Sequence, residues 1–202
     1  IMTGHRFDPT ILREYDIRGI VGETLHEADA RALGRAYAKM LTDNGGKSVA
    51  VGRDGRLSSP ALEAALVAGL AESGIDVVRI GLGPPPMLYF AGHTLGVDGA
   101  LMVTGSHNPG SHNGFKLMLG KKSLYGDDIK RLGAIAAAGD FVSGKGRVTD
   151  RAVKDAYVAR LLQDFRGGKK LKIAWDAGNG ATGEVLQALA AQLPGEHILL
   201  ND

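Results

Sequence analysis

The sequence predicts an α/β fold: a mixed, largely parallel sheet sandwiched by helices in a first domain, residues 1–148, and the start of a second, similar domain in residues 149–202. Short apolar runs alternate along the chain with stretches whose apolar residues recur every three to four positions, the pattern of strands alternating with helices. Glycine supplies 30 of the 202 residues, while aromatic residues make up only 5%. Many glycines suit the tight turns between the strands and helices of such a fold.

The first elements follow from local patterns. Residues 14–21 are expected to form a short strand or an extended loop. Residues 27–43 are predicted to be helical because their apolar side chains share one face, and Gly45-Gly46 would end the helix. That face comprises Leu33, Tyr37, Met40 and Leu41.

The second helix is expected to begin at Ser59-Pro60, with the serine as N-cap and the proline as first residue, and to end at Gly74. Residues 84–86 are three prolines, which should break the chain before a short helix over 87–95. The other expected strands cover 48–52, 76–81, 100–103, 115–119, 171–175 and 196–200; the other helices cover 127–138, 151–166 and 183–192; loops cover 105–113 and 177–182.

A polar, glycine-rich stretch at 139–149 predicts a domain boundary near 145–150. The helix at 151–166 then leads into a unit with only about two strands and one helix, which is too little to bury a full sheet. We therefore expect the chain to be truncated within its second domain.

Composition excludes several classes of function. The net charge is +2 and the basic residues are scattered, which argues against nucleic-acid binding. No apolar run approaches the roughly 18 residues that a membrane-spanning helix needs. The absence of cysteine rules out disulfides and thiol catalysis and is typical of a cytoplasmic enzyme. No sequence feature sets the oligomeric state, and we favour a monomer.

The most informative segment is the loop at 104–109, which follows an apolar strand. Ser106 lies in it beside His107 and Asn108, and Lys116 follows ten residues later. A hydroxyl is a weak nucleophile that needs an activating neighbour, so this combination indicates a site that moves a charged group. The Gly-x-Ser-x-Gly pattern of α/β-hydrolases is absent.

Thr104–Pro109, followed by Asn113–Lys116, resembles the phosphoserine loop of the α-D-phosphohexomutase superfamily. Three further segments are similar to family segments in the same order: Arg13–Gly19, Gly52–Arg56 and Asp176–Ala181. The resemblance spans nearly the whole chain. The Tyr-Asp-Ile-Arg-Gly form of the first segment is most similar to bacterial phosphomannomutase/phosphoglucomutase enzymes, and less to phosphoglucosamine mutases.

The resemblance implies an isomerase, that is, an intramolecular phosphotransferase that interconverts hexose 1-phosphate and hexose 6-phosphate, of mannose and/or glucose. Ser106 would carry a phosphoryl group and pass it to a sugar phosphate, making a hexose 1,6-bisphosphate that serves as intermediate and activator. The partners would be small-molecule sugar phosphates, not nucleic acid or membrane. This chain alone is expected to be inactive.

The resemblance also implies roles for the neighbours of Ser106. Lys116 would neutralise phosphate charge or shuttle a proton, and Arg18 would offer a planar fork of donors to phosphate. His107 would orient the phosphoserine or assist proton transfer, and Asn108 would fix the turn and bind phosphate. Tyr15 would line the sugar-phosphate entrance. Taken singly, Lys116 and Arg18 are more typical of solvated surface charges.

The family binds Mg²⁺ through a phosphoserine oxygen and an Asp-Gly-Asp-Gly-Asp cluster. No such cluster occurs in residues 1–202, so the phosphate on Ser106 would be the one metal ligand present. We expect no stable metal binding by this chain alone. We also expect Arg53 and Asp54 to form an ion pair that shapes the loop near Ser106, and His112 to be exposed.

The glycine-rich segment near the end of the chain also fits the motif of a different class of function. Gly178–Gly183 fits Gly-x-Gly-x-x-Gly, and Asp202 lies about twenty residues on, as in a dinucleotide-binding oxidoreductase. The carboxylate of Asp176 just before these glycines would repel a pyrophosphate, and the motif leaves residues 1–145 unexplained. The sequence is also compatible with a phosphoglucosamine mutase and with a catalytically silent sugar-phosphate binder.

Overall fold

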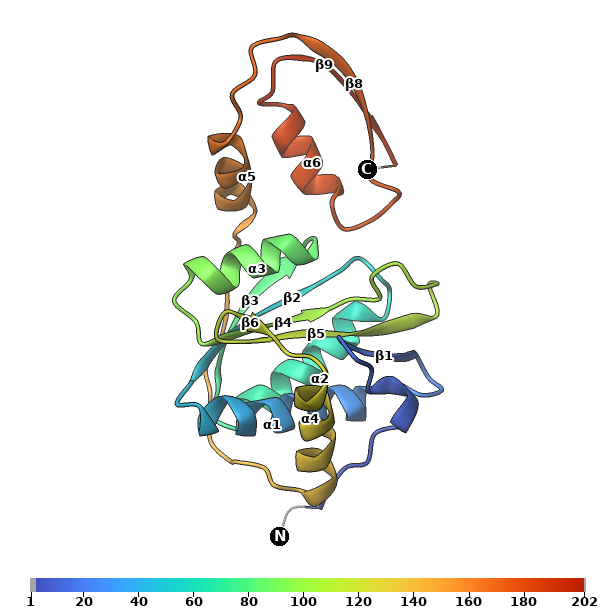
Figure 1. Cartoon of the computed structure of the whole chain (residues 1–202), viewed down its shortest axis with the longest axis vertical. Helices are drawn as coiled ribbons and strands as arrows, with labels where there is room; N and C mark the ends of the chain where they lie inside the picture. The colour runs from blue at the N-terminus through green and yellow to red at the C-terminus, as the bar shows by residue number, and fades with distance from the viewer. Residues whose placement is uncertain (1–2, 202) are drawn as a thin grey trace.

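A single mixed sheet organises the first unit of the chain (Figure 1). The computed structural model describes residues 3–201, and within them this sheet has seven strands. Their spatial order is β1 (Ile17–Ile20), β5 (His112–Leu119), β4 (Gly99–Val103), β2 (Ser48–Arg53), β3 (Asp76–Leu82) and β7 (Val148–Asp150), with β6 (Lys122–Ser123) beside β5. Strands β4, β2, β3 and β7 run parallel, whereas β1, β5 and β6 pair antiparallel. The prediction of a mixed, largely parallel sheet is confirmed.

Helices cover both faces of this sheet. Figure 1 shows α1 (Glu27–Asp43), α2 (Ser59–Ala71) and α4 (Asp127–Ala138) on one face and α3 (Pro85–Thr94) on the other, while a short 3-10 turn, η1 (Pro9–Ile11), precedes β1. The predicted apolar face of α1 is buried, and so is the stripe of α2 formed by Leu62, Leu66 and Leu70. The carboxylate of Asp29 starts α1 by accepting the backbone N–H of His26 at 2.7 Å.

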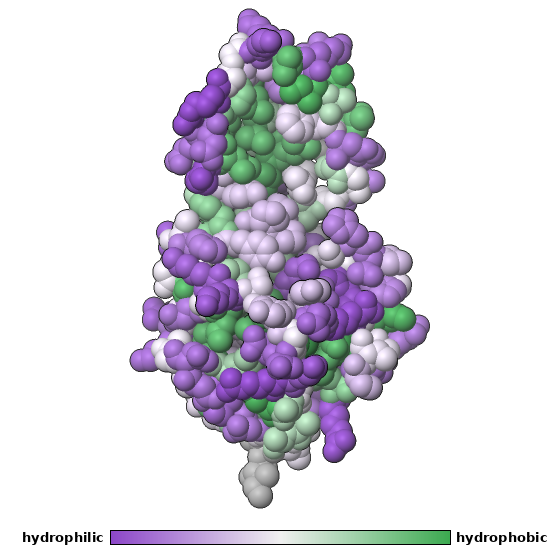
Figure 2. Space-filling view, viewed as in Figure 1, coloured by the Kyte–Doolittle hydropathy of each residue, from purple (hydrophilic) through white to green (hydrophobic). Residues whose placement is uncertain are grey.

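The second unit is a β-α-β arrangement that rests on α3. Strands β8 (Leu171–Asp176) and β9 (Gly195–Leu200) pair in parallel and are joined by α6 (Gly183–Ala190), and α5 (Lys154–Gln163) leads into them. Val158 and Val185 pack in the same apolar cluster as α3, and the ring of Tyr157 lies 5.6 Å from that of Phe90. Figure 2 shows apolar side chains gathered on this unit near α5 and α6.

Several boundaries differ from the sequence expectations. The prolines do not break the chain before a helix; Pro85 opens α3, because the first turn of a helix does not need the N–H that proline lacks. Strand β5 begins at His112, three residues early, because it pairs with β1. His112 is therefore half-buried, not exposed. Helix α2 has Ser58, not Ser59, at its N-cap position.

Strands β6 and β7 have no counterpart among the expected elements. All three residues of β7 are exposed and carry no apolar alternation, yet they pair in parallel with β3. Helix α5 spans ten residues, shorter than the expected 151–166. The domain division after residue 148 stays a prediction, and β7 attaches residues 148–150 to the first sheet. Among residues 3–201, no helix has both the length and the apolar character needed to cross a membrane.

The packing of α1 against α2 depends on two glycines. A Cβ built on Gly69 would lie 2.1 Å from the backbone oxygen of Arg31, and one on Gly34 would lie 2.5 Å from that of Leu66. Both contacts are with backbone atoms, which cannot move aside as the end of a flexible side chain could. Either methyl group would therefore have to push the helices apart.

We therefore predict that Gly69→Ala destabilises the protein by about 1–3 kcal/mol because it overpacks this contact. Helix propensity alone predicts the opposite sign, a gain of about 1 kcal/mol. Urea denaturation of the two proteins decides between them. A variant as stable as the parent, or more stable, would show that α1 and α2 do not approach this closely.

Candidate functional site

Ser106 lies exposed in the loop between β4 and β5, at the carboxyl edge of the parallel strands. Its backbone adopts a φ of +52°, in the left-handed region that residues other than glycine rarely occupy. Such a conformation is costly and persists only where surrounding contacts impose it. Contacts with the rest of the protein must therefore hold this loop in place.

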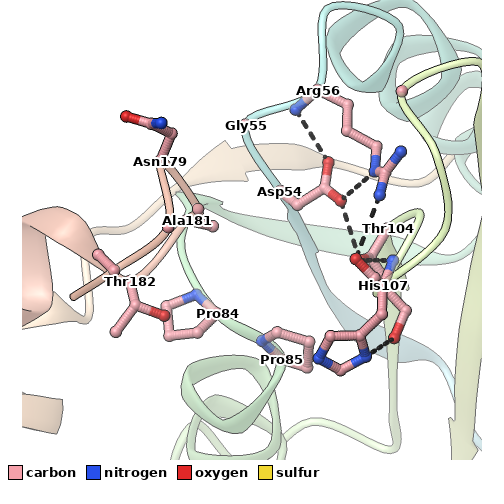
Figure 3. Close-up of a pocket in the computed structure, with 15 residues that line it drawn as sticks. Asp54, Gly55, Arg56, Pro84, Pro85, Thr104, His107, Asn179, Ala181 and Thr182 are labelled. Carbon is pink, nitrogen blue, oxygen red and sulfur yellow. Dashed lines mark hydrogen bonds and ion pairs between the residues drawn. The ribbon is translucent and has the colours of Figure 1, made fainter. Parts of the chain in front are cut away.

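The carboxylate of Asp54 holds the start of this loop from within the protein. Its Oδ2 accepts a hydrogen bond from Thr104 Oγ1 at 2.9 Å and from the Gly105 N–H at 3.0 Å (Figure 3). Thr104 Oγ1 in turn accepts the N–H of Ser106 at 2.9 Å. A buried carboxylate thus fixes the two backbone amides that immediately precede the serine side chain.

The same carboxylate binds the turn that follows β2. It accepts from Ser59 Oγ at 2.5 Å and from Arg56 N and Nε at 3.1 and 3.2 Å. The expected ion pair between Arg53 and Asp54 is wrong: Arg53 lies 3.2 Å from Glu63, and Arg56 is the partner of Asp54. Burial raises the pKa of the Glu63 carboxyl.

Asn113 connects β5 to the start of α2. Its amide group donates to Ser58 Oγ at 2.8 Å and Ser59 Oγ at 2.9 Å, and its side-chain oxygen accepts the N–H of Gly114 at 2.8 Å. Sequence reasoning assigned no role at this site to Asn113, and it gave Ser59 only the role of a helix N-cap. The available signal was that Asn113 and Asp54 both lie in segments that resemble the phosphohexomutases.

His107 and Asn108 both lie where the sequence places them, next to Ser106. His107 is exposed, with Nδ1 3.3 Å from Ser106 Oγ. The Asn108 side chain donates to the Gly105 carbonyl at 3.2 Å, and its backbone N–H donates to the same oxygen at 3.0 Å. The imidazole is therefore free to act at the hydroxyl, while the amide closes the turn.

Arg18 reaches the loop from the opposite side and is buried, with 1% of its surface exposed. Its Nη1 donates to the Thr104 carbonyl at 3.0 Å and its Nη2 to Asp16 at 2.6 Å. The same carboxylate oxygen of Asp16 accepts from Lys116 Nζ at 3.3 Å. These contacts connect Arg18 to the serine loop and to Lys116; its binding of phosphate stays a prediction.

Four of the six predicted site residues line two separate hollows, and Arg18 and Asn108 line neither of them. Ser106 and His107 line an open cleft of about 640 Å³, together with the loop at 177–182. Tyr15, which is 73% exposed, and Lys116 line a smaller hollow of about 220 Å³ with Tyr89, whose burial raises its phenol pKa. The structure therefore brings the predicted residues to one side of the sheet without placing all of them in one pocket.

The glycine-rich loop of the second unit lines the larger cleft together with Ser106, and Figure 3 shows Asn179 and Thr182 on the opposite side of it from His107. The carboxylate of Asp176 accepts from Asn201 Nδ2 at 3.1 Å and from the Gly178 N–H at 2.8 Å, and these bonds lower its pKa. The amide of Gly178, the first glycine of the motif, is thus occupied by a carboxylate of the protein, which disfavours a pyrophosphate there. Asp202, the acidic residue of the dinucleotide interpretation, lies outside the described residues.

The described residues do not form a magnesium site. Between residues 3 and 201, no three side chains of His, Cys, Asp or Glu gather where they could hold a metal ion. Asp54 is the carboxylate that contacts the serine loop, and both of its oxygens accept hydrogen bonds from the protein. A phosphate on Ser106 would find no carboxylate partner for a shared cation among these side chains.

Residues 9–143 match the family model described as phosphoglucomutase/phosphomannomutase, alpha/beta/alpha domain I. The chain belongs to this family. The match covers β1 to α4 and includes Asp54, Ser106 and Lys116.

Curated relatives agree with the family. A phosphomannomutase/phosphoglucomutase of Pseudomonas putida is 41% identical over 191 residues, covering 95% of this chain and 41% of the relative. A phosphoglucomutase of Neisseria gonorrhoeae is 43% identical over 175 residues, covering 86% and 38%. A crystal structure of a family protein from Burkholderia thailandensis superposes with a TM-score of 0.92 at 40% identity, covering 96% of this chain and 44% of that one. The chain spans about two fifths of the length of the curated relatives it matches.

We predict that Asp54→Asn destabilises the protein by about 1.5–3 kcal/mol, because an amide donor would face protein donors in place of a charged acceptor. The phosphorylation of Ser106 that the family resemblance predicts should fall with it. The matched control is Asp98→Asn, since Asp98 also accepts from backbone N–H groups, those of Lys47 and Ser48, away from the loop. Denaturation curves should show a lower free energy of unfolding for both variants. Intact-mass analysis should show that Ser106 phosphorylation is lost in Asp54→Asn alone. Equal phosphorylation of the two variants would contradict the assignment.

Proposed function

We propose that this chain supplies the phosphoserine part of a phosphohexomutase that interconverts hexose 1- and 6-phosphates of mannose and/or glucose. The observation that carries the proposal is Ser106 itself, an exposed hydroxyl held in a left-handed backbone conformation at the edge of an open cleft. The names of the relatives from Pseudomonas putida and Neisseria gonorrhoeae support the same reaction class.

In the proposed first transfer, a sugar hydroxyl oxygen attacks the phosphorus carried by Ser106. A new oxygen–phosphorus bond forms on the sugar while the bond between phosphorus and Ser106 Oγ breaks. His107, with Nδ1 3.3 Å from Oγ, gives the leaving oxygen a proton. Lys116, as a neutral amine, takes the proton of the attacking hydroxyl, and the ammonium so formed then neutralises phosphate charge. The hexose 1,6-bisphosphate then reorients, and its other phosphate returns to Ser106 by the same steps in reverse.

The charges of the chain suit this chemistry because phosphoryl transfer depends mainly on positioning and charge neutralisation. We assign Lys116 and Arg18 to the phosphate charge, Asn108 to the phosphate-bearing turn, and Tyr15 to the sugar entrance. For the full-length protein we also propose bound Mg²⁺, which would neutralise phosphate charge. We further propose that the full-length protein is a cytoplasmic monomer and that its first domain ends at residue 148.

The first test is where the phosphate resides. After incubation of the full-length protein with a hexose 1,6-bisphosphate and Mg²⁺, we expect intact-mass analysis to show one added phosphoryl group. It should vanish in Ser106→Ala and persist in Ser111→Ala. Ser111 is the matched control because it is exposed in the same loop and its Oγ lies 3.1 Å from Nδ1 of His112, much as Ser106 Oγ lies near His107. Phosphate on Ser111, or none on the parent, would refute the proposal.

The second test concerns Lys116. We predict that Lys116→Ala lowers kcat by about 10²–10⁴-fold, the usual contribution of a positioned proton-transfer group. Lys122→Ala, on the exposed strand β6, is the control and should retain the parental kcat. Steady-state rates with glucose 1-phosphate measure both variants. A parental rate for Lys116→Ala would remove the residue from the proposed mechanism.

A further inference from the structure

The guanidinium of Arg56 lies inside the curve of the serine loop and binds four of its backbone carbonyls. Its Nη2 donates to Ser106 O at 3.1 Å and to Asn108 O at 2.6 Å. Its Nη1 donates to Pro109 O at 2.6 Å and to His112 O at 3.0 Å. One side chain from the turn after β2 thus closes the whole segment between β4 and β5.

All donor capacity of Arg56 is used in this way. A guanidinium has five N–H groups and no acceptor. Four bind the loop carbonyls, and the fifth, on Nε, donates to Asp54 at 3.2 Å. An arginine at the rim of a phosphate-handling cleft would ordinarily be assigned to phosphate. Here no N–H remains for a substrate, so the arginine acts on the loop.

The shape of the loop is matched to this guanidinium. A Cβ on Gly105 would lie 2.0 Å from both Cζ and Nε of Arg56, so a side chain at position 105 and the guanidinium exclude each other. With its carbonyls turned inward to Arg56, the loop leaves the Ser106 side chain on the outside, facing the cleft. The left-handed φ of Ser106 is the backbone conformation that this requires.

We propose that Arg56 is a positioning residue for phosphoryl transfer: it holds the loop at 105–112 in the conformation that presents Ser106 Oγ to the cleft, and it does not bind the substrate. This inference rests on the proposed function of Ser106. Misplacing a reacting group by about 1 Å can cost about 10²-fold in rate, so the effect of Arg56 should be on kcat. Lysine cannot replace it, because an ammonium offers three donors from one point where five divergent ones are needed.

The test is chemical rescue in the full-length protein. Arg56→Ala should lower kcat by about 10²-fold, and KM should change by less than about threefold because no substrate contact is lost. Added guanidinium or methylguanidinium should restore much of the lost kcat to Arg56→Ala, but not to Arg56→Lys, whose side chain fills the space. The control is Arg131→Ala, which removes an exposed arginine of α4. Its kcat should equal that of the parent, with or without added guanidinium.

Three results with Arg56→Ala would overturn the proposal. A raised KM with a parental kcat would make Arg56 a substrate ligand, and an unchanged kcat would remove it from positioning. A folded Arg56→Ala protein that guanidinium does not rescue would show that the carbonyl contacts are not what it supplies. If Arg56→Ala does not fold, Gly105→Ala replaces it, since that methyl group displaces the guanidinium without removing the arginine; parental kcat in that variant also overturns the proposal.

Failure of the proposed function is recognised separately. If the parent protein transfers no phosphate, amide hydrogen exchange of the loop at 105–112 is measured in the parent and in Arg56→Ala. Faster exchange confined to this loop would support the role of Arg56 in holding it, although the function assigned to Ser106 had failed. Unchanged exchange would overturn the role of Arg56 itself.

Discussion

The buried carboxylate of Asp54 is the interaction on which the site depends. Taking a carboxylate out of water is costly unless it is paired and hydrogen-bonded, and Asp54 meets both conditions with Arg56, Ser59, Thr104 and Gly105. These partners come from three separate segments: the turn after β2, the start of α2, and the loop after β4. None of these three segments can move far without leaving the buried charge of Asp54 unsatisfied. The serine loop is therefore held fixed relative to the sheet.

Sheet topology explains why residues so distant in sequence meet. Asp54 and Thr104 are 50 residues apart, yet β2 and β4 are adjacent and parallel, with Arg53 in register with Val103. The segments that follow both strands therefore leave the sheet at the same edge. Ligands of α/β proteins commonly bind at the carboxyl ends of the strands, and the cleft beside Ser106 lies there. The glycine-rich loop that follows β8, in the separate second sheet, also lines that cleft.

The sequence predicted what is periodic or carried by a motif. Helix α1 has the predicted bounds of 27–43, because its apolar repeat is long, and Ser106 lies in the predicted loop. Strand β7 could not be predicted, because three exposed residues carry no pattern and depend on the edge of β3 for their pairing. The partner of Asp54 was equally hidden. Arg53 and Arg56 both lie within two positions of Asp54 in the sequence. Because Arg53 pairs with Glu63 of α2, Arg56 is the partner of Asp54.

Asp16 extends this preorganisation from the loop to Lys116. One of its carboxylate oxygens binds both Arg18 and Lys116, and Arg18 in turn holds the carbonyl of Thr104, two residues before the serine. The position of the ammonium and the position of the loop are therefore set by one connected group of charges. In phosphoryl transfer, donors fixed before the substrate arrives need no reorganisation during the reaction. Buried Arg18 is therefore connected to the proposed site in two ways: by the phosphate charge assigned to it, and by its contacts with the serine loop and with the carboxylate that binds Lys116.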